Sequence, residues 1–313
     1  MLGEQERLHS FPDDEHWFES WWFAFYVPER RLSVYVYPWF RPGIGVAGGG
    51  VFAWDDSGSL PWTMVHNDYQ WSRSFGGEAS MLEDNRLVMP QGVTVDVLEE
   101  ARRYRLSYDH PRLAFEVEFE AVAEPFANSA ATGELGVFKG HIDQPGRYHG
   151  WLRVGEERYP VDCHCVRDRS WGPRRNDVLD MHIGYFHATA SGRDAFLMVM
   201  GGGEDPDRFT LLNGYLIRDG VRAALVSGSA HMRRGHDLAP ANCSIEAVDE
   251  LGRVLGAEGH AIACMAAQVQ PGMFNWSSLT RWNFGSAMAY GELQDTWHPD
   301  GYRDFARSRM PHP

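Results

Sequence analysis

The first half of the chain contains the stretch Leu113-Ala114-Phe115-Glu116-Val117-Glu118-Phe119-Glu120-Ala121, in which apolar and acidic residues alternate. An alternation of period two is typical of a half-buried β-strand. One face carries Leu113, Phe115, Val117, Phe119 and Ala121, and the other carries Glu116, Glu118 and Glu120. Similar alternation runs through 32–37 and 103–108, and turn residues recur between such segments, for example at 55–58, 144–146 and 219–220. The sequence therefore predicts an all-β chain with few short helices, the best helical candidate being 302–310.

The two halves of the chain share a weak internal repeat at an offset of about 160 residues. Segments 23–27, 32–39 and 51–54 correspond to 182–186, 195–200 and 215–217. Two copies of a meander-like unit predict two tandem antiparallel β-barrels, since up-and-down barrels are built in this way. We expect an N-terminal barrel over 1–165 and a C-terminal barrel over 166–313, with a junction motif at 167–174.

Composition limits the partners. The chain has 313 residues, a formal net charge of −14 and 12 Trp, 12 Tyr and 17 Phe. An acidic surface disfavours nucleic acid, and aromatic side chains favour strands and line cavities for apolar ligands. No apolar run is long enough for a transmembrane segment, and the first residues do not resemble a signal peptide, so we expect a cytoplasmic protein. A homodimer is left open.

No metal or cofactor is predicted. Cys163-His164-Cys165 lacks the usual Cys-x-x-Cys spacing and has no second cluster to complete four ligands. The chain also has no phosphate-binding loop and no nucleophile elbow.

A resemblance to a known family rests on three segments of the sequence. These are His141-Ile142-Asp143-Gln144-Pro145-Gly146-Arg147, Gly150-Trp151-Leu152-Arg153-Val154 and Arg167-Asp168-Arg169-Ser170-Trp171-Gly172-Pro173-Arg174. Together they resemble the AttH-like / carotenoid 1,2-hydratase superfamily of tandem lipocalin-like (calycin) domains. The resemblance implies a hydrophobic or polyene-like ligand and cofactor-free hydration of an isoprenoid double bond; some relatives are pericyclic cyclases. The usual family form has His where this chain has Arg169, so any acid–base step of that His is missing here or is done otherwise.

The junction motif has two interpretations. Asp168 lies among Arg167, Arg169 and Arg174, which would favour its charged form and suit a catalytic carboxylate. The same residues, with Trp171 as a ligand-contacting ring, could instead form a structural ion-pair network at the junction.

The following strand supplies two further catalytic candidates. Asp180 and His182 fall on one face, while Tyr185 and His187 fall on the other, so Asp180 and His182 could act as an acid–base pair inside a barrel. Single histidines are more often satisfied polar residues. We predict that ligand contacts come from the aromatic and polar residues Trp171, Tyr185, His66, Trp62, Trp71 and Tyr26.

The preferred function is a cofactor-independent hydro-lyase that adds water to a double bond of a hydrophobic isoprenoid or polyene-like small molecule. A carrier for a lipophilic metabolite without chemistry of its own is one alternative. A cyclase or isomerase that holds a flexible substrate in a reactive shape is the other.

Overall fold

The computed structural model describes residues 9, 14–74, 82–83, 85–127, 139–174 and 181–309, and for 71–74 and 82–83 only the backbone. The chain forms two compact units. The first comprises Met1–Trp54 and Val65–Arg174, and the second comprises Asp55–Met64 and Arg175–Pro313. Residues 166–174, expected in the second half, are therefore part of the first unit, where most of them extend one long strand. None of the helices in the described residues is long and apolar enough to cross a membrane.

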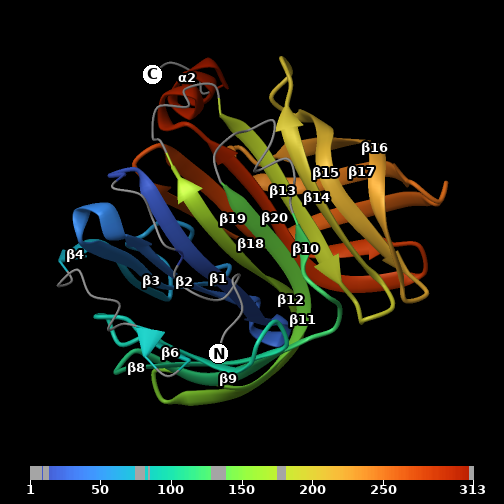
Figure 1. Cartoon of the computed structure of the whole chain (residues 1–313). Helices are drawn as coiled ribbons and strands as arrows, with labels where there is room; N and C mark the ends of the chain where they lie inside the picture. Colours follow the sequence, from blue (N-terminus) through green and yellow to red (C-terminus); the bar gives the residue numbers. More distant parts are fainter. Residues whose placement is uncertain are drawn as a thin grey trace. The chain divides into compact units, whose positions relative to one another are not determined.

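The first unit is a twelve-stranded antiparallel sheet (Figure 1). Its strands follow the order β4-β3-β2-β1-β12-β11-β9-β8-β7-β6-β5, and β10 pairs with β11. The bounds are β1 Trp17–Val27, β2 Leu32–Arg41, β3 Val46–Trp54, β4 His66–Ser74, β5 Leu82–Glu83, β6 Arg86–Val88, β7 Thr94–Glu99, β8 Arg103–His110, β9 Leu113–Ala121, β10 Phe126–Ala127, β11 Gly140–Val154 and β12 Glu157–Pro173, with short 3₁₀ turns at Pro28–Arg30 and Pro42–Ile44.

The second unit is a closed eight-stranded barrel, in which consecutive strands pair and β13 closes onto β20. The bounds are β13 His182–Thr189, β14 Ala195–Gly202, β15 Arg208–Arg218, β16 Val221–Arg234, β17 Pro240–Asp249, β18 Val254–Gln270, β19 Met273–Phe284 and β20 Ala287–Trp297, followed by the helix α2 Pro299–Arg309. The prediction of an all-β, lipocalin-like chain is thus confirmed, and the helix expected near 302–310 is α2.

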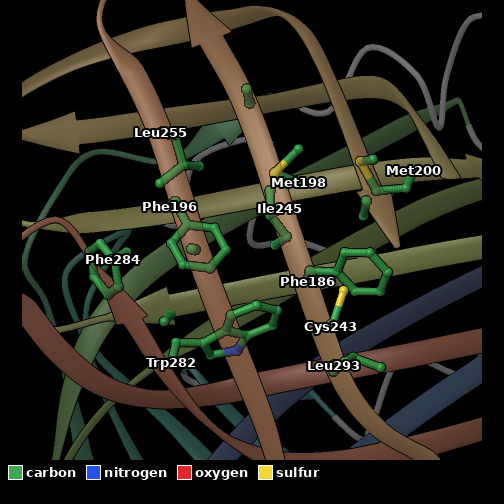
Figure 2. Close-up of a cluster of buried hydrophobic side chains, with 14 of the residues drawn as sticks. Phe186, Phe196, Met198, Met200, Cys243, Ile245, Leu255, Trp282, Phe284 and Leu293 are labelled. Carbon is green, nitrogen blue, oxygen red and sulfur yellow. The ribbon is translucent and has the colours of Figure 1, made fainter. Parts of the chain in front are cut away.

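Each unit has its own core. In the first, the apolar positions of β9 from Leu113 to Phe119 are buried and its glutamates exposed or half-buried, as the alternation predicts. Phe115 and Phe119 meet aromatic rings of β1, β8 and β11, among them Phe25 and Tyr148. The barrel is filled by the cluster shown in Figure 2, which includes Phe196, Met198 and Trp282.

The turn predicted at Gln144–Gly146 is wrong, because these residues lie within β11. β9 pairs with β11 from Gly146 onward, and β10 pairs with Ile142 and Asp143. Pro145 falls between these two ladders. Its missing N–H therefore costs no ladder hydrogen bond on that side.

Candidate functional site

The junction motif is divided between the two faces of the sheet. It lies in β12, between β1 and β11, and side chains of a strand alternate in direction. Arg167, Arg169 and Trp171 lie on the face of Phe23, which we call the Phe23 face. Asp168 and Ser170 lie on the opposite face. Side chains of consecutive residues therefore lie on opposite faces of the sheet. On each face their partners come from β1 and β11, which are both adjacent to β12 in the sheet.

On the Phe23 face, Arg169 and Trp171 meet a carboxylate that the sequence alone does not mark as a site residue. Glu19 of β1 is fully buried and forms an ion pair with Arg169. Its Oε1 accepts hydrogen bonds from the Trp17 indole at 3.1 Å and from the backbone N–H of His9 at 2.8 Å. We call Glu19, Arg169, Trp171, Trp17 and His9 the Glu19 cluster.

Glu19 is held as an anion. Burial alone would raise the pKa of this carboxyl, but the hydrogen bond from His9, the charge of Arg169 and the Trp17 N–H outweigh it and bring the pKa below its usual value. Arg169 also packs its guanidinium 3.7 Å from the ring centre of Trp21 and donates to two backbone carbonyls. Both members of the ion pair are thus held in place by further contacts, Glu19 by His9 and Trp17 and Arg169 by Trp21 and the backbone.

The imidazole of His9 is the member of the Glu19 cluster that could transfer a proton. Its Nδ1 lies 3.3 Å from Glu19 Oε2, and its ring stacks on Trp171 with a centroid separation of 4.5 Å. A carboxylate can only accept, so Nδ1 carries a proton, and in the neutral ring Nε2 carries the lone pair. Nε2 is buried and has no hydrogen-bond partner among the described residues.

On the opposite face, Asp168 belongs to a second group, the His141 cluster, made of His141, Asp143, Asp168 and Ser170. His141 Nε2 lies 3.1 Å from Asp143 Oδ1, and its Nδ1 lies 2.8 Å from Ser170 Oγ. Burial would lower the pKa of His141, but the nearby carboxylates of Asp143 and Asp168 outweigh it and raise the pKa above its usual value. Asp168 is half-buried, whereas Asp143 is fully buried.

His182 lies in the second unit, at the end of the barrel nearest α2. Its Nε2 lies 3.0 Å from Asp295 Oδ1, and its ring stacks on Trp297 at 3.5 Å. Asp295 Oδ2 also accepts from Arg234 at 2.5 Å and from the Trp297 indole at 2.8 Å. Burial opposes ionisation, yet Arg234 and His182 hold the pKa of Asp295 below its usual value. Asp180, the partner predicted for His182, lies outside the described residues.

The predicted grouping of His66 with Trp62 and Trp71 stays a prediction. His66 is buried in β4, where its Nε2 meets the Tyr108 hydroxyl at 3.0 Å. Trp62 belongs to the second unit and its side chain is 78% exposed. The Trp71 side chain lies outside the described part of the chain.

The remaining predicted residues are distributed over both units. Tyr26 is buried and donates to the His164 carbonyl at 2.5 Å, whereas Tyr185 is half-buried beside His187. Arg167 contacts Gln144 and the Tyr104 ring, and Arg174 lies over Phe18. The arginines of the junction motif thus pack on aromatic rings within the first unit.

Glu19 and Asp295 were missed by sequence reasoning, although one signal was present for Glu19. It stands in Trp17-Phe18-Glu19-Ser20-Trp21-Trp22, on the same alternating face as Trp17 and Trp21. A charged residue at an apolar position of a strand is buried at a cost unless it is paired. No comparable pattern marks His9, whose place depends on the folded structure.

The fold, with its closed eight-stranded barrel and its twelve-stranded sheet, is an all-β, lipocalin-like fold. It is similar to an AttH-type protein from Nitrosomonas europaea, with a TM-score of 0.60 and 13% identity over 90% of this chain and 92% of that chain. It is also similar to kievitone hydratase from Nectria haematococca, with a TM-score of 0.52 and 11% identity over 90% and 88%. At these identities the likeness shows the fold alone.

Residues 3–299 match the family described as a domain of unknown function (DUF7064), and the chain belongs to that family. No curated protein matches the sequence.

Proposed function

We propose that the protein is a cofactor-independent hydro-lyase that adds water to a double bond of a hydrophobic, isoprenoid or polyene-like small molecule, with the Glu19 cluster as its site. The observation that carries the proposal is the buried Nε2 of His9, which has no partner among the described residues while Nδ1 is held by an anionic carboxylate. This carboxylate–imidazole arrangement orients a ring for proton transfer at its other nitrogen. The similarity in fold to a hydratase supports the reaction class.

The reaction needs one proton to be given and one to be taken back. The imidazolium form of His9 donates its Nε2 proton to one carbon of the double bond, and positive charge develops on the other carbon. Water adds to that carbon, and neutral Nε2 accepts the proton that the water releases. The ring returns to its starting form, so the net change is alkene plus water to alcohol.

The other members of the Glu19 cluster position the acid–base group. Glu19 accepts the Nδ1–H of His9 and so fixes its tautomer and the orientation of its ring. Arg169 holds Glu19 in its ionised form. The indole of Trp171 offers an electron-rich surface beside the reacting carbons, which favours a developing cation. Asp168 and His182, the acid–base residues proposed from the sequence, are the competing assignment.

The proposal is tested with a panel of prenyl and polyene compounds in deuterated water. We expect turnover to place one deuterium on carbon, and His9→Gln to lower the rate by about 10²–10⁴-fold with binding retained, the usual contribution of a general acid–base group. His16→Gln is the matched control, since His16 is a partly exposed histidine outside the Glu19 cluster.

Two results would contradict parts of the proposal separately. If bound compounds never gain deuterium, the protein is a carrier or works without proton transfer. If turnover survives His9→Gln but is lost in Asp168→Asn or His182→Gln, the reaction stands and the Glu19 cluster is not its site.

A further inference from the structure

The His141 cluster brings three metal-ligating side chains to one point on the face opposite the Glu19 cluster. In the register of β11 and β12, Asp143 stands directly opposite Asp168, and His141 opposite Ser170. The imidazole and the two carboxylates each offer a ligand atom, and these atoms lie within 4.8 Å of one another. One imidazole and two carboxylates are a donor set that suits Zn²⁺ and Mn²⁺.

The spacing inside the cluster suits a bound ion. His141 Nε2 and Asp143 Oδ1 are 3.1 Å apart. Two ligands that each lie about 2.1 Å from one ion are separated by roughly 3.0 Å at a right angle and 3.4 Å at a tetrahedral angle. An ion could therefore enter between these atoms with little movement of either side chain.

The orientation of the imidazole is that of a metal ligand. His141 Nδ1 lies 2.8 Å from Ser170 Oγ, so the hydroxyl can accept the Nδ1–H. This contact fixes the orientation of the ring so that Nε2 faces the carboxylate of Asp143. Metal-bound histidines commonly donate their second ring nitrogen to such a partner, which sets both tautomer and ring angle.

The charge and burial of the His141 cluster favour the binding of a cation. Asp143 is fully buried, and Asp168 faces it across the strand pair. Like charges directly opposite on adjacent strands are destabilising, and a cation that both carboxylates ligate removes this repulsion. Because Asp168 is only half-buried, it leaves a route from solvent.

We propose that His141 Nε2 and the carboxylates of Asp143 and Asp168 bind one divalent transition-metal ion, which cross-links β11 to β12. The role is separate from the proton transfer assigned to His9, because the two clusters occupy opposite faces of the same strands. The ion would stabilise the strand pair that carries Arg169 and Trp171.

Manganese is the preferred probe, because Zn²⁺ also binds exposed histidines. The chain is treated with a chelator, dialysed and titrated with Mn²⁺ by calorimetry, with free Mn²⁺ followed by electron paramagnetic resonance. We expect one ion per chain, a rise in unfolding temperature on binding, and a loss of affinity of at least about ten-fold in His141→Gln and Asp168→Asn. Asp162→Asn is the control, since Asp162 is an exposed carboxylate of β12 outside the cluster.

The outcome is decisive even where a variant folds poorly. The wild-type titration needs no variant, so absence of binding up to about 1 mM Mn²⁺ overturns the proposal. Binding that is equally strong in folded His141→Gln and Asp168→Asn chains, as judged by near-ultraviolet circular dichroism, places the ion elsewhere and overturns it too.

Discussion

At the scale of single residues, the ion pair of Glu19 and Arg169 is the most consequential contact of the first unit. Both side chains are fully buried. Removing one partner leaves an uncompensated buried charge, so we expect Glu19→Gln to lower the free energy of unfolding by about 3–5 kcal/mol. Urea unfolding measures this change.

The matched comparison is the exposed pair of Arg147 and Asp162 on β11 and β12. Solvent screens exposed pairs, so Asp162→Asn should cost less than about 1 kcal/mol. Equal losses in the two variants would show that burial of Glu19 and Arg169 is not what makes their pairing important.

The environment of His66 predicts that the free energy of unfolding falls in acid when this single side chain is protonated. Burial, together with the nearby His110, lowers its pKa to about 4, from an ordinary value of 6.5. Tyr108 donates its hydroxyl hydrogen to Asp68 at 2.7 Å, so its oxygen accepts from Nε2–H of His66. The lowered pKa leaves this ring neutral at pH 7.

The depressed pKa of His66 means that the unfolded chain binds the proton first. Stability from this group is complete above about pH 6.5 and is lost as the pH falls toward 4, by an amount on the order of 3 kcal/mol. His66→Gln should remove that part of the decline when urea unfolding is compared at pH 7 and 4.5. His260→Gln, at an exposed position, should decline as the wild type does.

At the scale of elements, the lack of a side chain at Gly172 lets the backbone of Lys139, next to β11, come close to β12. Its φ of +128° is one that residues with a Cβ rarely adopt, and a Cβ there would lie 2.3 Å from the backbone nitrogen of Lys139. That nitrogen donates to the Trp171 carbonyl at 2.9 Å. Gly172→Ala should therefore lower the free energy of unfolding by more than about 2 kcal/mol.

Gly155, in the turn between β11 and β12, is the control position, because an alanine there adds backbone strain without a steric contact. Its φ is +59°, and a Cβ there would meet nothing within 4 Å. Gly155→Ala should cost about 1–2 kcal/mol, the left-handed strain alone. Chemical unfolding of both variants tests this, and an equal cost at the two positions would rule out the Lys139 contact as the cause.

The strands themselves were largely readable from the sequence. The alternation at 113–121 gives β9 its bounds and its buried face, because a half-buried strand must repeat every two residues. Pro145 shows the limit of such reading: a proline between Gln and Gly looks like a turn, and only the arrangement of β9 and β10 reveals why a strand accepts it.

At the scale of the whole molecule, the two units differ in how their sheets end. Every strand of the barrel pairs on both sides, whereas β4 pairs only with β3 among the described residues. Edge amides open by local fraying, so hydrogen exchange over β4 should be at least about 100-fold faster than over β13 and β20. Mass spectrometry of exchanged peptides measures this, and equal protection of β4 and β13 would contradict it.

The sequence by itself determined the all-β class and the resemblance to the AttH-like superfamily, because alternation and motif are local properties. The tertiary structure decided which residues surround the junction motif. Asp168 stands opposite Asp143, whereas Arg169 pairs with Glu19 and His182 with Asp295. Partners from distant strands are set by strand order and register, and shifting a register by one residue moves every side chain to the other face. For that reason the chemistry of each face of β12 could be predicted only once its neighbouring strands were known.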